Sequence, residues 1–184
     1  PPRVLSWSYA LVLAVLGLTL ILGIRRIGLS LPHNRPLWSL LLAALFSQGA
    51  AFVLLFVDSL ANPQGTLVAF DPTFYFCMSS LLLTLAATYD PVPPVYRWTG
   101  LLDAALAVFI ALMFYGLVRA LVAGAEAQPE NARAIMWMFD GMALFVAVFA
   151  SLRLLGARRR DERRFFVVLA AFAWIELFAP AAHN

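Results

Sequence analysis

The stretch that decides the fold is GARRRDERRFFVVLAAFAWIELF, residues 156–178. Five arginines and two acidic residues lie directly before a run of apolar side chains, and one glutamate, Glu176, lies inside that run. A helix needs about 20 mainly apolar residues to cross a hydrocarbon layer of about 30 Å, and arginine accumulates in short connectors on the cytoplasmic side. The stretch therefore predicts a membrane-spanning helix that starts at the cytoplasmic surface and carries a carboxyl group within the bilayer.

The composition of the whole chain is typical of a membrane protein. Of the 184 residues, 63% are hydrophobic and 12% are charged, whereas a soluble domain is about half apolar and about a quarter charged. The chain has no lysine, which excludes Schiff-base chemistry and a P-loop. Its single cysteine, Cys77, excludes an internal disulfide. The arginines lie beside apolar runs and not on a polar domain, so no nucleic-acid partner is expected and the lipid bilayer is the expected surroundings.

Six apolar runs separated by short polar connectors predict an all-α integral membrane protein, with one polytopic transmembrane domain over residues 1–184. Each run has about 18 to 23 residues, the length that crosses the hydrocarbon layer. The predicted spans are residues 7–24, 37–57, 68–89, 100–121, 134–155 and 165–182. Prolines support these limits, because most of them fall in connectors and Pro72 lies near a helix start, where its missing N–H costs little.

The distribution of arginine sets the expected orientation. Ten of the thirteen arginines flank the first, third and fifth connectors, and three lie on the opposite side. The positive-inside rule therefore places the amino terminus and residue 184 outside, in a bacterial cytoplasmic membrane. Five arginines between the last two runs form an expected cytoplasmic anchor, here called the arginine anchor: Arg158, Arg159, Arg160, Arg163 and Arg164. The anchor serves as a topology signal, and it can also bind anionic lipid headgroups at about 1 kcal/mol per arginine.

Polar residues inside the apolar runs are the candidate functional residues. Glu176 and Gln48 lie near the middle of their runs, and Asp140 lies about two turns from the outer end of its run. Charged groups at membrane depth are costly and usually face the protein interior. The predicted site is a cavity open to the outer side, lined by Glu176, Asp140, Gln48 and also His183, which can share a helix face with Glu176. Such a cavity can bind a small ligand or cation, or relay protons; alternatively, these groups only hydrogen-bond between helices.

Motifs of catalysis and of cofactor binding are missing from the sequence. It contains no HExxH, GxSxG, GxGxxG or GxxxxGK[ST] and no cluster of cysteine and histidine. His33 and His183 fall on opposite membrane faces in the predicted topology, so they cannot ligate one haem. The chain itself is therefore expected to be non-catalytic, and neither a cofactor nor a metal is predicted.

Two stretches, RWTGLLDAALAVFIALMFYGL and SLRLLGARRRDERRFFVVLAAFAW, resemble the polytopic amino-terminal membrane regions of bacterial signalling proteins. In those proteins the membrane region precedes a cytoplasmic GGDEF diguanylate cyclase or histidine kinase domain. The shared pattern is an arginine and LLDA opening one span, an acidic residue in the next, then an arginine-rich connector followed by FF. In this chain these are Arg97, residues 101–104, Asp140, the arginine anchor and the Phe165–Phe166 pair. The resemblance covers about the last half of the chain and transfers no catalytic residue.

Three functions follow from this reading. The first is a membrane-embedded sensory or regulatory module. If this is the function, we expect the chain to continue beyond residue 184 into a seventh span and an output domain. The second is a non-catalytic subunit of a larger membrane assembly, energy-transducing or photosynthetic, with other membrane subunits or further copies of the chain as partners. The third is a small transporter, ranked last because the sequence has no convincing internal repeat.

Overall fold

A computed structural model describes residues 2–61, 72–89, 109–110, 112–121 and 129–178, and every statement on structure below concerns these residues. All of the regular structure in them is helical. The helices are α1 (Pro2–Leu29), the 3₁₀ turn η1 (Pro32–Asn34), α2 (Arg35–Ala61), α3 (Pro72–Thr88), the segment Leu112–Leu121, α5 (Pro129–Gly156) and α6 (Arg160–Phe178). The all-α prediction is therefore confirmed for the described part of the chain.

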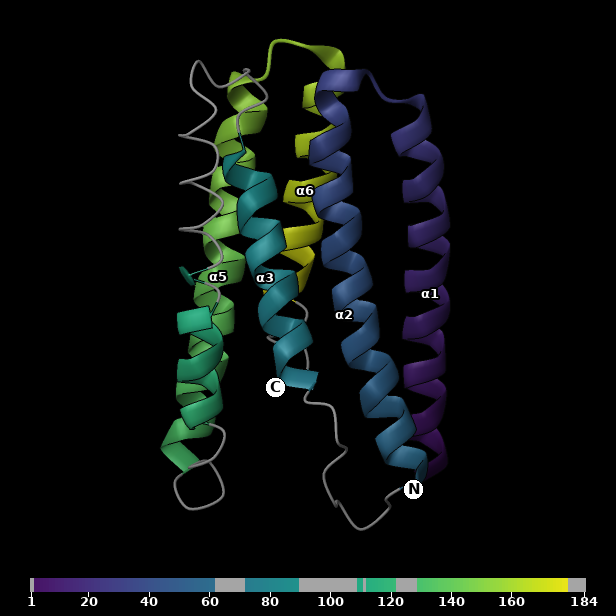
Figure 1. Ribbon diagram of the computed structural model, residues 1–184, viewed down its shortest axis with the longest axis vertical. Coiled ribbons are helices and arrows are strands. Elements are labelled where there is room, and N and C mark those ends of the chain that lie inside the picture. Colours follow the sequence, from purple (N-terminus) through teal and green to yellow (C-terminus); the bar gives the residue numbers. More distant parts are fainter. Residues whose placement is uncertain (1, 62–71, 90–108, 111, 122–128, 179–184) are drawn as a thin grey trace.

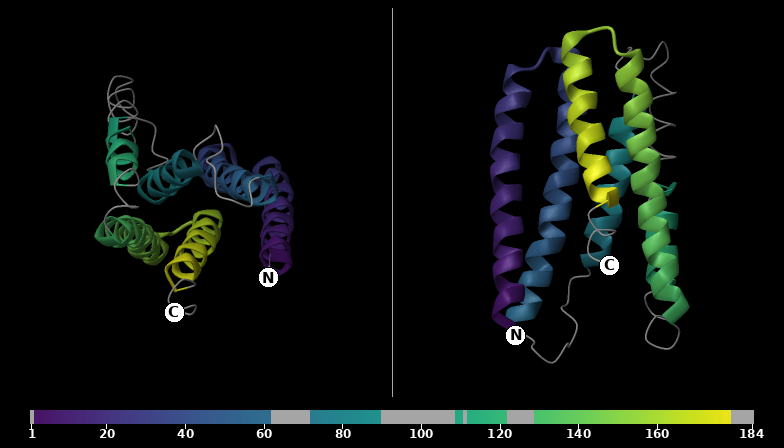
Figure 2. Two further views of the ribbon diagram at one scale, coloured as in Figure 1. Left: turned by 90° about the horizontal axis from the view of Figure 1, so that it is seen from below. Right: turned by 180° about the vertical axis from the view of Figure 1, so that it is seen from behind.

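The helices form a bundle of two rows. α1, α2 and α3 lie side by side in one row, while α5 and α6 form a second row that contacts α3 and α2 (Figures 1 and 2). The α1–α2 and α5–α6 connections lie at the same end of the bundle (Figure 1). α1 lies close to α2 at Gly23, where an added Cβ would be 2.5 Å from Cδ1 at the tip of the Leu42 side chain.

Three helices have the length and apolar character to cross a membrane. The qualifying segments are Val12–Leu29, Arg35–Asp58 and Arg133–Gly156, which coincide with the first, second and fifth predicted spans. α3 and the segment Leu112–Leu121 are apolar but shorter. α6 begins with a charged turn, so its apolar part within the described residues runs only from Phe165 to Phe178. The described structure therefore contains three helices that can cross a membrane, and the count of six spans stays a prediction.

Helix starts follow the prolines, as expected. Pro2, Pro72 and Pro129 each open a helix, and Pro36 is the second residue of α2. Proline is favoured there because the first N–H groups of a helix have no intrahelical partner. Several boundaries differ from the predicted spans. α1, α5 and α6 each begin five residues earlier than predicted, and α1 also continues five residues beyond residue 24, the predicted end of the first span. Arginine is a good helix former, and its long side chain can reach the interface from inside a helix, so the pair at 25–26 does not end α1.

The apolar core lies in the half of the bundle nearer the α5–α6 connection. It is built by the first turns of α2 and α6 and by the last turns of α3 and α5. Phe165, Phe166 and Leu169 of α6 are almost fully buried, and Phe165 meets Trp38 edge-to-face at a centroid distance of 5.1 Å. Trp174 Nε1 donates a hydrogen bond to Ser151 Oγ at 3.2 Å, which joins α6 to α5 within the bundle.

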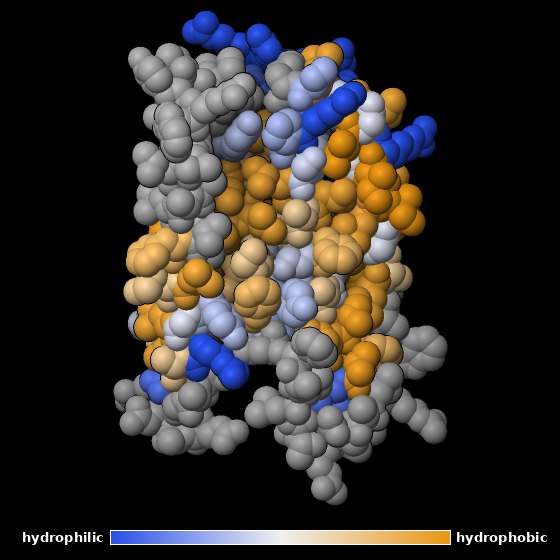
Figure 3. Space-filling view, viewed as in Figure 1, coloured by the Kyte–Doolittle hydropathy of each residue, from blue (hydrophilic) through white to orange (hydrophobic). Residues whose placement is uncertain are grey.

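The outer surface is apolar around its middle and polar toward its ends (Figure 3). Large apolar side chains are exposed along several helices, among them Ile24, Trp137 and Ile175. An exposed apolar band of this kind is expected where lipid, and not water, contacts the protein.

Candidate functional site

A cavity of about 490 Å³ lies between α2, α3, α5 and α6, beyond the apolar core as seen from the arginine-rich end. Its polar lining comes from four helices: Gln48 of α2, Ser79 and Ser80 of α3, Asp140 of α5 and Glu176 of α6. This space, here called the polar cavity, has the volume of a typical small-molecule site, which is about 300–1,000 Å³.

The three predicted residues reach the polar cavity because they lie at a common depth. At 1.5 Å per residue, Gln48 is about 20 Å from the start of α2, and Glu176 is about 24 Å from the start of α6. Asp140 is about 24 Å from the end of α5, and these three helix ends all lie at the arginine-rich end (Figure 1). Helices that run side by side therefore bring residues that are far apart in the sequence to one level.

One hydrogen bond crosses the bundle at this level. Gln48 Nε2 donates to Glu176 Oε1, which links α2 in one row to α6 in the other. The other amide atom of the same side chain, Gln48 Oε1, is buried and accepts no hydrogen bond from any described residue. An unpaired buried acceptor is costly, so the polar cavity has an acceptor position that a ligand or a water molecule can fill.

In the predicted sixth span Glu176 lies within the bilayer, and there the Gln48 hydrogen bond alone would be too weak to compensate for a charged carboxylate. A charged side chain near the bilayer centre costs about 2.5–3.5 kcal/mol on insertion scales. Interhelical hydrogen bonds in membranes contribute about 0.6 kcal/mol on average and up to about 1.7 kcal/mol. Glu176 therefore requires a further compensating partner, which can be a proton or a bound cation.

The remaining walls of the polar cavity are aromatic and apolar. Phe52 of α2 meets Phe76 of α3 edge-to-face at 5.5 Å, and Phe139 of α5 contacts Phe114 in the same way at 5.7 Å. Phe52, Phe76 and Phe139 all line the space, together with Met142. The sequence analysis missed these phenylalanines and the serines of α3, because nothing in a continuous apolar run distinguishes a residue that faces a cavity from one that faces lipid.

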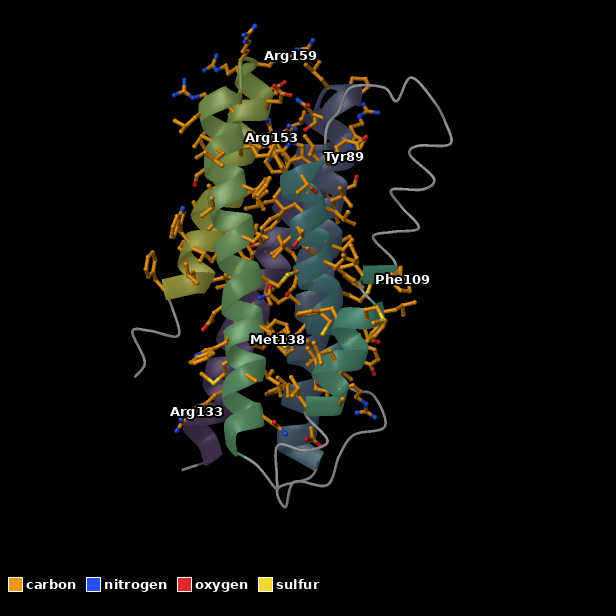
Figure 4. The ribbon with its side chains drawn as sticks, turned by 90° about the vertical axis from the view of Figure 1, so that its left-hand side faces the viewer. Tyr89, Phe109, Arg133, Met138, Arg153 and Arg159 are labelled. Carbon is orange, nitrogen blue, oxygen red and sulfur yellow. The ribbon has the colours of Figure 1, made fainter. Side chains whose placement is uncertain are left out.

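Other predicted residues lie elsewhere. His183 lies outside the described residues. The arginine anchor lies in and next to the α5–α6 connection, at the end of the bundle opposite Arg133 (Figure 4, where Arg159 and Arg133 are labelled). Its arginines are all exposed, and none of them lines the polar cavity.

Two arginines at the same end hold helices together. Arg153 Nη2 donates to the carbonyl oxygen of Tyr89 at 2.8 Å and lies 5.3 Å from the centre of the Phe166 ring (Figure 4). Arg26 lies over the Trp38 ring at 5.4 Å and pairs with Asp161 at 3.7 Å. These two arginines therefore have structural partners in neighbouring helices.

Metal binding by the chain alone finds no support in the described part of the structure. No group of three or more histidine, cysteine, aspartate or glutamate side chains there is arranged to hold a metal ion. The polar cavity contributes two such residues, Asp140 and Glu176, and its other oxygen ligands are one amide and two hydroxyls.

Comparison with known proteins identifies no relative: no family model, no curated protein sequence and no solved structure matches this chain. The fold and the site define the class only as an all-helical membrane protein with a polar cavity inside its bundle.

Proposed function

We propose that this chain is the membrane-embedded input module of a bacterial signalling protein, in which a small molecule in the polar cavity changes the arrangement of the cytoplasmic end. In this proposal the chain crosses the inner membrane six times, with its amino terminus outside, and performs no catalysis itself. Its partners are the bilayer, anionic lipid headgroups at the arginine anchor, and an output domain or a second membrane subunit.

The orientation is supported by the charge at the two ends of the bundle. Of the arginines with described side chains, nine lie near the α1–α2 and α5–α6 connections, and two, Arg119 and Arg133, lie toward the opposite end. The positive-inside rule assigns the arginine-rich end to the cytoplasm. The polar cavity then lies in the outer half of the bundle, within reach of a ligand that enters from outside.

The observation that carries the proposal is the cavity itself, where the hydrogen bond between the side chains of Gln48 and Glu176 joins the two rows. The Gln48–Glu176 bond joins α2 to α6, and a ligand that pairs with either side chain competes with it. A ligand shifts an equilibrium only through different contacts with two states. Here the two states are a bundle with this hydrogen bond formed and one with it exchanged for contacts to the ligand.

The path to the cytoplasmic end is one rigid helix. α6 runs from Glu176 through the buried residues Ala173 and Leu169 to the pair Phe165–Phe166, and the arginine anchor precedes this pair. Because α6 packs against α5 and contacts α2 where Phe165 meets Trp38, a displacement at Glu176 is carried along the helix to the anchor. An output domain attached at the cytoplasmic side would receive this displacement.

The resemblance to the membrane regions of GGDEF cyclases and histidine kinases points to the same role. The competing function is a non-catalytic subunit of a larger membrane complex. The deciding experiment is the intact mass and peptide map of the natively expressed polypeptide, extracted with its partners in mild detergent. A polypeptide that continues into a soluble output domain supports the input module. A polypeptide that ends near Asn184 and co-purifies with stoichiometric membrane subunits refutes it.

A further inference from the structure

We infer that the polar cavity binds a small organic cation, an ammonium group that carries apolar or aromatic substituents. The inference deepens the proposed function and rests on it, because it names the chemical class of the molecule that the input module detects. It depends on three features of the cavity: the charge of its lining, its unpaired acceptor and its aromatic walls.

The lining favours positive charge. Asp140 and Glu176 contribute carboxyl groups, and none of the described residues that line the polar cavity is basic. An anionic ligand would meet two acidic side chains and no compensating cation, whereas an ammonium group supplies the counter-charge that these carboxyls lack. Nine of the described arginines lie at the other end of the bundle, and Arg133, about 10 Å from Asp140 along α5, does not line the cavity.

The hydrogen-bonding groups match an ammonium donor. Gln48 Oε1 is buried and has no donor among the described residues, while Gln48 Nε2 is occupied by Glu176. The Gln48 atom that has no partner among the described residues is therefore an acceptor. An ammonium group carries only donors, so it can satisfy this acceptor and a carboxylate together.

The walls match the substituents of an organic amine. Phe52, Phe76 and Phe139 present aromatic rings to the polar cavity, and Met142 adds a polarisable side chain. Cations are attracted to aromatic faces, and alkyl or aryl groups gain from leaving water for an apolar wall. A bare divalent ion would use neither feature, and the described residues offer no group of three acidic, histidine or cysteine ligands for it.

The polar residues of the cavity differ in exposure. Asp140 is exposed, Gln48 and Glu176 are half-buried, and Ser79 is buried. An incoming amine can therefore meet Asp140 first and Glu176 and Gln48 afterwards. This order gives Asp140 the role of attracting the cation and gives the deeper pair the role of holding it.

The test is a calorimetric titration of the full chain in nonionic detergent with three probes of similar shape: benzylammonium, benzyl alcohol and benzoate. Saturable binding of benzylammonium, with benzyl alcohol weaker and benzoate absent, is the expected result. Asp140→Asn and Glu176→Gln should each weaken benzylammonium binding by at least about tenfold, the effect of losing one charge-assisted hydrogen bond.

Two further variants distinguish a specific loss of ligand binding from a failure to fold. Asp161→Asn makes the same change of charge outside the cavity, at the contact with Arg26, and should leave binding unchanged. Ala143→Phe fills the cavity from α5 without altering charge and should abolish binding. Helical content by circular dichroism and a single gel-filtration peak are required of every variant.

The outcomes distinguish this inference from the proposed function. If benzyl alcohol or benzoate binds as tightly as benzylammonium, or if the carboxyl variants bind it normally, the cation assignment is wrong while the cavity remains a ligand site. If none of the three probes binds, the assignment also fails. The input-module proposal is decided separately, by the length and the partners of the native polypeptide.

Discussion

Gln48 and Glu176 should be energetically coupled, and a double-mutant cycle measures this directly. The two side chains lie on α2 and α6 and make the hydrogen bond that crosses the bundle at the polar cavity. The cycle uses Gln48→Leu, Glu176→Leu and the double variant. Leucine keeps each position apolar and similar in size, so the changes remove polar contacts with little change in packing.

The single variants have opposing effects. Gln48→Leu loses the hydrogen bond and leaves Glu176 without its partner, but it also removes the buried acceptor Gln48 Oε1 that no described residue satisfies. Glu176→Leu removes a carboxyl that is costly at membrane depth, but it leaves Gln48 Nε2 unpaired. Each single variant therefore gains stability from one change and loses stability from another. The coupling energy from the double-mutant cycle isolates the contribution of the hydrogen bond. Double-mutant cycles in membrane proteins give about 0.6 kcal/mol on average and up to about 1.7 kcal/mol.

We expect the double variant to be destabilised by about 1 kcal/mol less than the sum of the two single variants. The assay is reversible unfolding in mixed micelles by titration with sodium dodecyl sulfate, followed by circular dichroism. Gln48→Leu combined with Ser151→Ala is the control, because no described contact joins these two residues, and its effects should add. Independent sites usually add within about 0.3–0.5 kcal/mol. A coupling energy between Gln48 and Glu176 that is zero within this error would show that their hydrogen bond does not stabilise the contact between the rows.

Three further predictions concern the core, the orientation and the anchor. Phe165→Ala should lower the free energy of unfolding by about 3–5 kcal/mol, because this side chain is fully buried. Val167→Ala, at the exposed surface, should lower it by about 0.5 kcal/mol or less. Equal losses of stability in the two variants, in the same unfolding assay, would contradict the described core. In a Cys77→Ser background, a membrane-impermeant maleimide should label Arg133→Cys in intact cells and Arg159→Cys only in inverted vesicles, and the reverse pattern would overturn the orientation. Replacing all five residues of the arginine anchor by glutamine should strongly reduce the anionic phospholipid that co-purifies in detergent, since each arginine near the surface contributes about 1 kcal/mol; unchanged lipid content would leave the anchor as a topology signal alone.

The helices could be predicted from the sequence because each one depends only on the residues of its own segment. An apolar run long enough to cross the bilayer must satisfy its backbone groups internally, and a helix does this without any other part of the chain. The first, second and fifth predicted spans therefore coincide with long apolar helices of the structure. The end of α1 was harder to predict, because Arg25 and Arg26 carry the charge of a connector but have the backbone preference of a helix.

The lining of the cavity was predictable only in part, because its polar residues stand out in the sequence and its aromatic and small residues do not. A glutamate, an aspartate and a glutamine in apolar runs are conspicuous in the sequence, and their unfavourable transfer into lipid predicts that they face the protein interior. Nothing in the sequence distinguishes Phe52 or Ser79 from the apolar and small residues around them. Their place in the lining depends on which helices are neighbours and on how each helix is rotated about its axis.

The sequence alone determined that the chain is helical and that some of its helices can cross a membrane. It also determined which end of the bundle is rich in arginine. These features were predictable because the transfer of side chains between water and lipid acts on each segment separately. Tertiary structure alone decided that α2 and α6 meet at Gln48 and Glu176, that the core fills the arginine-rich half, and that a polar cavity lies beyond it. These features arise from close packing between helices, where the fit of Phe165 against Trp38 and of α1 at Gly23 selects one arrangement. Trp38 and Phe165 lie more than a hundred positions apart in the sequence, and no local pattern predicts their contact.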